Sequence, residues 1–367
     1  MVDSDNSVGK YTSIDVTEVP ENFPHPSYTK VAISYYHQTS QSLRVALYAS
    51  YPFPGGWTIH TVDDSALPTN ARGTYTSLKF PEGSYLPLIA YHASSELNMT
   101  GSVRIASWLG GGNGNCGDDN SWHCETVDSG DGLDYGSHVS MDINQNDDTA
   151  YIAFYEPYWG TVRLAHYYGF GGSCSNPDYE CQDIDETNHV GQFLSLHAPD
   201  NPTDIMRLVY YDENVEYVKY AEYVGTGGNC FSTTAYDCYY LELADLPATN
   251  FDLAQTVDED GYPVIVYTVA TEEMGPTQLR MARPASTYDQ VFGNCGEVRD
   301  GEAGPYWMCE TIDAGGAHAD VAQWVDVSVS PSGLVSIAYS EYNDYDDETY
   351  LKVAQQHYET YMPLIIR

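Results

Sequence analysis

Short apolar runs recur along the chain at intervals of roughly 60 residues, and polar or turn-forming residues separate them. The most apolar run ends in an aromatic residue and occurs six times, at residues 33–35, 89–91, 152–154, 208–210, 265–267 and 337–339. An aliphatic–basic–x–Ala run follows each copy after a loop, at residues 43–46, 103–106, 162–165, 218–221, 279–282 and 351–354. Such short alternating runs predict β-strands.

Two more elements complete the repeat. One closes the unit and mostly ends in Asp, at residues 57–63, 122–128, 179–185 and 307–313, with a degenerate copy at 237–243. The other opens it, at residues 11–14, 75–78, 138–141, 193–196, 251–253 and 324–327. Helical periodicity is absent from the sequence pattern, a solenoid would need shorter repeats, and a sandwich would not repeat.

Six copies of a four-strand unit predict an all-β protein, a six-bladed β-propeller of four-stranded antiparallel blades. We expect one domain over residues 1–367. Its blades should span approximately 4–63, 64–128, 129–185, 186–243, 244–313 and 314–367.

One position of the repeat is always basic. The six residues are Arg44, Arg104, Arg163, Lys219, Arg280 and Lys352. Each could pair with an acidic residue of an adjacent strand, or it could point into solvent from its own strand.

Eight cysteines form four sequence-local pairs: Cys116 and Cys124, Cys174 and Cys181, Cys230 and Cys238, and Cys295 and Cys309. They lack the C-x2-C spacing of a zinc knuckle. We therefore predict four disulfides, each in the outer hairpin of a blade, and an oxidising compartment.

The net charge of −39 argues against nucleic acid and against an anionic membrane surface as partners. No run approaches the ~20 apolar residues that a membrane span needs. The N-terminal MVDSDNSVGK has no signal-peptide character. The predicted localisation is nevertheless extracellular or at the cell surface, with the export signal lying outside this sequence.

The chain begins with Val2-Asp3, which aligns with the end of a closing element, whereas the sixth repeat lacks one. The apolar tail is the candidate missing strand: Tyr361, Met362, Leu364, Ile365 and Ile366. It could close blade six within one molecule, or it could be donated to a neighbouring copy. The second possibility would give a homo-oligomer or homopolymer.

The segments VDSDNSVGKYTSIDV, VAISYYHQTSQSLRVALYA and WTIHTVD resemble a repeat of secreted bacterial and archaeal β-propellers. The resemblance covers all six units and implies an extracellular protein used for display, adhesion or binding. That family has Asp after the tyrosine pair. This chain instead has His37, His92, Glu156, Asp212, Thr268 and Ser340, so the resemblance does not imply a uniform ligand site there. The ending YMPLIIR resembles the C-terminal motif of some secreted bacterial proteins.

Catalytic motifs are absent from the sequence. The repeat arginines lie on different blades, so they do not predict the three-arginine cluster of a sialidase. The histidines show no metal-binding spacing. We predict no cofactor and no metal site, with Ca²⁺ in the acidic loops 128–134, 144–148 or 343–348 as the alternative. Asn98, in the sequon Asn98-Met99-Thr100, is a possible glycosylation site.

These observations predict a non-enzymatic extracellular structural or interaction protein, self-assembling into a surface or matrix filament through its C-terminal strand. A carbohydrate-binding, lectin-like propeller with a glycan partner is one alternative. A glycoside hydrolase of sialidase type is the other.

Overall fold

The computed structural model describes residues 2–3, 8–22, 26–52, 55–64, 70–186, 189–244, 251–270, 277–288, 290–298, 306–316, 319–330, 332–343, 348–357 and 360–366. The fold prediction is confirmed: the chain is a six-bladed β-propeller with four-stranded antiparallel blades. It divides into two compact units, residues 1–186 with 198–203 and residues 187–197 with 204–367.

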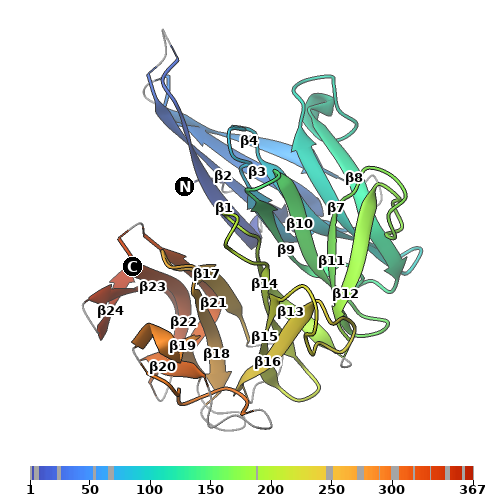
Figure 1. Ribbon diagram of the computed structural model, residues 1–367. Helices are drawn as coiled ribbons and strands as arrows, with labels where there is room; N and C mark the ends of the chain where they lie inside the picture. The colour runs from blue at the N-terminus through green and yellow to red at the C-terminus, as the bar shows by residue number, and fades with distance from the viewer. Residues whose placement is uncertain are drawn as a thin grey trace. The chain divides into compact units, whose positions relative to one another are not determined.

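The first unit contains blades 1 to 3, in each of which four strands pair in chain order (Figure 1). Blade 1 consists of β1 (Val8–Val19), β2 (Tyr28–His37), β3 (Ser42–Ala49) and β4 (Gly56–Asp63). Blade 2 consists of β5 (Arg72–Lys79), β6 (Leu88–Ser95), β7 (Thr100–Trp108) and β8 (Trp122–Asp131). Blade 3 consists of β9 (Ser137–Asn144), β10 (Thr149–Glu156), β11 (Thr161–Tyr167) and β12 (Tyr179–Asp185).

The second unit contains blades 4 to 6. Blade 4 consists of β13 (Val190–His197), β14 (Arg207–Asp212), β15 (Tyr217–Tyr223) and β16 (Tyr236–Leu243). Blade 5 consists of β17 (Leu253–Val257), β18 (Pro263–Ala270), β19 (Thr277–Pro284) and β20 (Trp307–Asp313). Blade 6 consists of β21 (Ala319–Val329), β22 (Val335–Asn343), β23 (Glu348–His357) and β24 (Thr360–Ile366).

The C-terminal tail forms β24 and pairs with β23 of the same chain, with Val353 opposite Leu364. The fourth strand of blade 6 is therefore supplied by the same chain in this structure, and donation to a neighbouring copy stays untested. The side chains of Tyr361, Met362, Leu364, Ile365 and Ile366 lie outside the described part of the structure.

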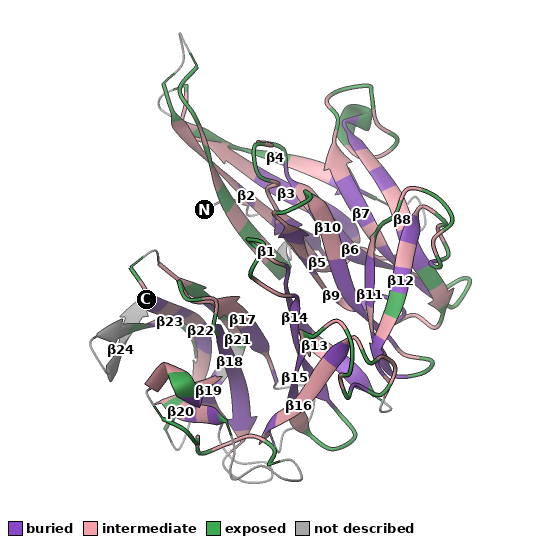
Figure 2. Ribbon diagram, viewed as in Figure 1, coloured by how far each residue is buried: buried purple, intermediate pink, exposed green. Residues whose placement is uncertain are grey.

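The middle strands of the blades are buried on both faces. All six residues of β14 are buried (Figure 2), and Ile89, Ala90 and Tyr91 of β6 are fully inaccessible. One apolar cluster joins Leu43 and Val45 of blade 1 to residues of blade 2, and a second joins blades 2 and 3. Since each large buried aliphatic side chain contributes about 1.5–3 kcal/mol, these contacts between sheets hold neighbouring blades together.

The four disulfides have the predicted pairing. Each closes the connection between the third and fourth strands of its blade, and in blades 2 and 3 this connection also contacts the preceding blade. Asp118 accepts a hydrogen bond from the Thr61 amide of β4 at 2.8 Å. Neighbouring Gly117 has φ +75°, and a Cβ there would lie 2.6 Å from the Thr61 oxygen. We call residues 109–121 the hook loop of blade 2.

Disulfides are typical of oxidising compartments, which is consistent with an extracellular protein. Among the described residues, no helix is long and apolar enough to cross a membrane.

Candidate functional site

Most of the repeated basic residues form an ion pair with a carboxylate of the preceding blade. At the junction of blades 1 and 2, Asp63 accepts a hydrogen bond from the Tyr91 hydroxyl at 2.5 Å. Arg104 Nε lies 3.2 Å from Asp63 and donates to Tyr91 at 3.1 Å. Burial and the Asp63 charge raise the pKa of Tyr91, so the hydroxyl stays a hydrogen-bond donor.

The same arrangement recurs with other residues. Asp3 accepts from Tyr35 at 2.6 Å and pairs with Arg44 at 3.4 Å. Asp313 accepts from Tyr339 at 2.7 Å and from Lys352 at 3.1 Å. Asp3 thus binds the tyrosine and the basic residue of blade 1 in the way that Asp63 binds those of blade 2.

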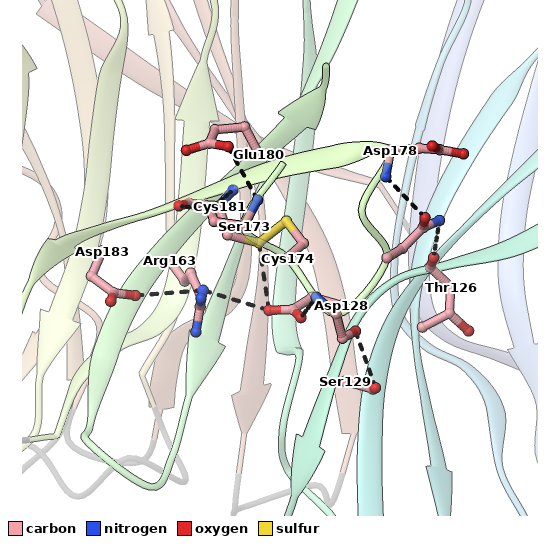
Figure 3. Close-up of a disulfide and its surroundings, with 12 residues drawn as sticks. Thr126, Asp128, Ser129, Arg163, Ser173, Cys174, Asp178, Glu180, Cys181 and Asp183 are labelled. Carbon is pink, nitrogen blue, oxygen red and sulfur yellow. Dashed lines mark hydrogen bonds and ion pairs between the residues drawn. A yellow bond between two sulfur atoms is a disulfide. The ribbon is translucent and has the colours of Figure 1, made fainter. Parts of the chain in front are cut away.

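Blade 3 has Phe154 where the other described junctions have a tyrosine, and a different residue supplies the hydroxyl. Tyr135 donates to Asp128 at 2.7 Å, and Arg163 Nε lies 3.5 Å from the same carboxylate. Figure 3 shows Asp128 between Arg163 and the disulfide, with Cys181 Sγ 3.5 Å from its oxygen. Both cysteines near Asp128 are oxidised in the disulfide, so this group is not a thiolate metal site.

The closing element of blade 4 is one residue earlier than the sequence pattern suggested. Opposite Val218 lies Glu242, as Asp128 lies opposite Val103 in blade 2. Glu242 accepts from Tyr267 at 2.6 Å and from two nitrogens of Arg280, at 3.2 and 2.7 Å. The copy at 237–243 is therefore correctly read as 236–242, and its terminal acid is conserved in function as Glu242.

The remaining basic residue, Lys219, lies 3.7 Å from Asp212 of its own blade and 4.7 Å from the centre of the Tyr240 ring. Of the two readings of the basic position, pairing is the one observed. Because the repeat arginines are committed to separate junctions, they do not form the three-arginine cluster of a sialidase.

The position after the tyrosine pair supports hairpin turns. Glu156 accepts the amides of Tyr158 and Trp159 at 3.0 and 2.8 Å. Asp212 accepts the amides of Asn214 and Val215 at 3.2 and 3.3 Å. Their carboxylates hold the loops between the second and third strands.

His92, the equivalent residue of blade 2, contacts Thr74 Oγ1 at 2.6 Å and the Leu133 carbonyl at 2.9 Å. Burial lowers its pKa to about 4, against the opposing effects of the Leu133 carbonyl and Asp134. The imidazole is therefore neutral over most of the physiological range.

In two of the acidic loops proposed for Ca²⁺, some side-chain oxygens accept hydrogen bonds from the protein. Asp128 belongs to the junction described above, and in the turn 144–148 Asn144 accepts the amide of Asn146 and Asp147 accepts the amide of Thr149. Residues 344–347 of the third loop lie outside the described residues. Asn98 is exposed in the turn between β6 and β7. Calcium binding and glycosylation stay predictions.

The first strands of blades 1 to 3 share a β-bulge that carries a ring in left-handed backbone conformation. Tyr11, Tyr75 and His138 have φ of 52°, 50° and 52°. The Tyr75 ring lies 4.5 Å from Tyr11 and 4.4 Å from His138, centre to centre. Burial and neighbouring His92 lower the pKa of His138 to about 3. These rings cover one another and link the first strands of unit one.

Blade 5 departs from this pattern. Strand β17 pairs with β18 from Leu253 onward without a register shift, so the bulge is missing. Asp252 precedes the strand, and its main-chain oxygen accepts the Thr268 amide at 3.1 Å. Its carboxylate accepts the Leu253 amide at 2.9 Å and the Val325 amide of β21 at 2.8 Å. Asp252 thus connects the first strands of blades 5 and 6.

The surroundings of Asp252 favour its protonated form. Burial raises its pKa to about 7, and the negative charge of Asp326 adds to the shift, although two amide donors oppose it. Trp324, which precedes the Val325 amide, exposes 67 % of its surface. A carboxyl with a raised pKa thus feels the charge of a second carboxylate, and the exposed Trp324 directly precedes the residue whose amide binds it.

Sequence reasoning missed this group. The segments 251–253 and 324–327 were identified as strands, but Phe251 was aligned with the aromatic position and Asp252 was given no role. The available signal was the aspartate in each segment, Asp252 and Asp326, at positions where other repeats have aromatic or hydroxyl side chains.

No protein-family model and no curated protein matches the chain. The resemblance to secreted propeller repeats stays a prediction.

Solved structures with a related fold include glycoside hydrolases. An α-L-arabinofuranosidase from Lactobacillus brevis is 8 % identical, with a TM-score of 0.40, over 88 % of this chain and 92 % of that one. An engineered GH43 glycoside hydrolase with endo-xylanase and exo-arabinofuranosidase activity is 11 % identical, with a TM-score of 0.35, over 92 % and 80 %. An exo-β-1,3-galactanase from Phanerochaete chrysosporium is 7 % identical, with a TM-score of 0.41, over 94 % and 76 %.

These matches correct the predicted function. A non-enzymatic, filament-forming protein was expected, whereas these similar structures are glycoside hydrolases; the WD40 domain of SCAP from fission yeast, 7 % identical with a TM-score of 0.37 over 98 % of this chain and 92 % of that one, is similar as well. At these identities the likeness concerns the fold, so no residue role is transferred from it.

Proposed function

We propose that this protein is an exported glycoside hydrolase in which Asp252 acts as the general acid. The carrying observation is the position of Asp252, a partly buried carboxyl with a pKa of about 7 beside a second carboxylate. Glycosidases use two carboxyl groups, one protonated to donate to the leaving oxygen and one ionised. Asp326 is the ionised partner in this proposal.

Trp324 supports the proposal from the same pair of first strands. Its indole is exposed and lies one residue before the amide that binds Asp252. A flat, exposed indole offers an apolar face to a sugar ring. The substrate class is accordingly a glycan, and the four disulfides suit an extracellular enzyme.

The test is turnover by the full chain. Nitrophenyl glycosides of arabinofuranose, xylose and galactose, and the corresponding polysaccharides, are assayed for nitrophenol or reducing-end release. The Asp252→Asn variant should lose about 10³-fold in kcat/KM on the polysaccharides, because general acid catalysis contributes roughly 10²–10⁴-fold where the leaving group is a sugar hydroxyl. Its loss on the nitrophenyl glycosides should be smaller, because nitrophenol leaves without a proton donor. Asp326→Asn removes the ionised partner and should lower kcat/KM on the polysaccharides by a similar factor.

Asp15→Asn is the matched control. Asp15 accepts the next amide, that of Val16, at 2.8 Å and an amide of the following blade, that of Phe80, at 2.7 Å. This is the hydrogen-bond pattern of Asp252 at another junction, so the control should keep full activity. Glycan binding without turnover would refute the hydrolase assignment, and an Asp252→Asn variant as active as the native chain on the polysaccharides would refute the role of Asp252.

A further inference from the structure

A second candidate site lies in unit one. A cavity of about 280 Å³ opens between blades 1 and 2. Its lining includes Lys30 from β2, Leu47 and Tyr48 from β3, Phe80 and Tyr85 from the loop after β5, and Trp108 from β7. Most of this wall is apolar or aromatic, and the Lys30 ammonium is its charged group.

Lys30 differs from the other partly or fully buried lysines. Lys79, Lys219 and Lys352 pair with Asp142, Asp212 and Asp313 at 3.1, 3.7 and 3.1 Å. Lys30 Nζ donates to the Tyr85 carbonyl at 3.0 Å, and no carboxylate among the described residues forms an ion pair with it. Burial lowers its pKa.

An ammonium in an apolar wall is costly unless an anion neutralises it. The chain carries 53 acidic residues, yet none of those that the structure describes forms an ion pair with Lys30. Two of its three N–H donors are left for another acceptor.

The aromatic wall is fixed in place before any ligand enters. The Trp108 ring packs edge-on against Trp122 at 5.1 Å and against His60 at 5.3 Å. On the opposite blade, Tyr48 packs against Trp57 at 5.3 Å. Rings held in this way bind a flat partner without loss of side-chain freedom.

We propose that this cavity binds a small organic acid consisting of one six-membered ring that bears one carboxylate. The carboxylate pairs with Lys30, and the ring lies against Trp108 and Tyr48. The cavity is at the lower limit of ordinary ligand pockets, which suits a single ring rather than an oligosaccharide. A uronic acid and an aromatic acid share this chemistry.

The test titrates the full chain with methyl β-D-glucuronide and with benzoate, followed by calorimetry and tryptophan fluorescence. Methyl β-D-glucoside and benzamide are the uncharged counterparts. At least one acid should bind at least tenfold more tightly than its counterpart, and the tighter acid identifies the ligand as sugar or aromatic. Equal binding of acid and counterpart, or no saturable binding of either acid, would overturn the proposal.

Lys30→Met keeps the length of the side chain and removes its charge, so acid binding should weaken at least tenfold. Lys10→Met, at an exposed position of β1, is the control and should bind as the native chain does. Should Lys30→Met fail to fold, the pH dependence of acid binding by the native chain tests the role of Lys30 instead. Binding must fall as pH rises through the lowered pKa of Lys30, and pH-independent binding would contradict its role. The result does not depend on Asp252 or on hydrolysis.

Discussion

The junction of blades 1 and 2 and the junction of blades 5 and 6 use one hydrogen-bond pattern in opposite electrostatic surroundings. Asp15 and Asp252 each accept the following amide and an amide of the next blade, at 2.7–2.9 Å. Near Asp15 lies Lys79, whose pKa is raised by Asp142 and then Asp15 against the effect of burial. Near Asp252 lies Asp326, another acid.

The difference shows how a repeat protein can hold one carboxyl with a raised pKa in a link that another junction makes with Asp15. The link between blades needs an acceptor that reaches two amides, and either aspartate provides it. Only the neighbouring charge and the degree of burial decide whether that acceptor also holds a proton near pH 7. The role proposed for Asp252 therefore depends on the surroundings of its carboxyl and not on the pair of amide hydrogen bonds, which Asp15 makes as well.

The largest expected effect concerns the stability of Asp252→Asn. A carboxyl whose pKa is raised from 3.8 to about 7 in the folded state opposes folding once it must ionise, so stability is lost as pH rises through that range. Between pH 5 and pH 9 the native chain should lose about 2–3 kcal/mol that the variant does not lose. Urea unfolding at both pH values measures the difference.

Asp15→Asn is again the comparison for this effect. It removes an acceptor from the same pattern of amides, so its cost should be similar at pH 5 and at pH 9. If both variants gained the same stability relative to the native chain between pH 5 and pH 9, or if neither gained any, the contrast between the two junctions would be wrong.

The next effect concerns the Cys116–Cys124 disulfide, which the junction of blades 1 and 2 has and the junction of blades 5 and 6 lacks. The hook loop of blade 2 is closed by Cys116–Cys124 and contacts β4 through Asp118, whereas blade 6 has no cysteine. Replacing both cysteines by alanine should cost about 2.5 kcal/mol, the loop-closure value for a separation of 8 residues.

Asp118→Ala keeps the disulfide and removes the hydrogen bond to Thr61, which should cost about 1 kcal/mol. Urea unfolding of both variants separates the cross-link from the contact. A cysteine pair whose removal costs no more than Asp118→Ala would show that the disulfide adds nothing to this junction.

Much of the fold could be predicted because every blade solves the same packing problem with the same residue classes. The buried Ile89-Ala90-Tyr91 type of strand and the paired cysteines are direct consequences of two-faced burial and local cross-linking. The alignment of Val2-Asp3 with a strand end was also informative, since Asp3 binds Tyr35 and Arg44.

The candidate site could not be predicted in this way, because it depends on where the repeat is broken. Without the bulge, the residue that directly precedes the strand at Leu253 is Asp252. The sequence spacing instead assigned Phe251 to the aromatic position that opens the strand. The one-residue error at Glu242 was avoidable, because Glu242 follows Cys238 by four residues, as Asp128 follows Cys124. The pKa of Asp252 is raised first by burial in the folded chain and further by Asp326, which is 74 residues away in sequence.

The smallest effect compares the tyrosines of the two junctions. Tyr91→Phe removes the hydroxyl that binds both Asp63 and Arg104, and should cost about 1–2 kcal/mol. Tyr339→Phe should cost about 1 kcal/mol, because Asp313 keeps hydrogen bonds from Lys352 and from the Gly315 amide. Urea unfolding at pH 7 measures both.

The pH dependence of Tyr339→Phe then tests the mechanism. Burial raises the pKa of Asp313, but hydrogen bonds from Tyr339, Gly315 and Lys352 outweigh it and the pKa falls below its usual value of 3.8. A lowered carboxyl pKa stabilises the fold above the unfolded value, and this contribution is lost as pH falls. The cost of Tyr339→Phe should therefore shrink at pH 3. An unchanged cost would mean that the hydroxyl acts through packing, and Phe154, which occupies the same position in blade 3 beside the hydroxyl of Tyr135, shows that packing there needs only the ring.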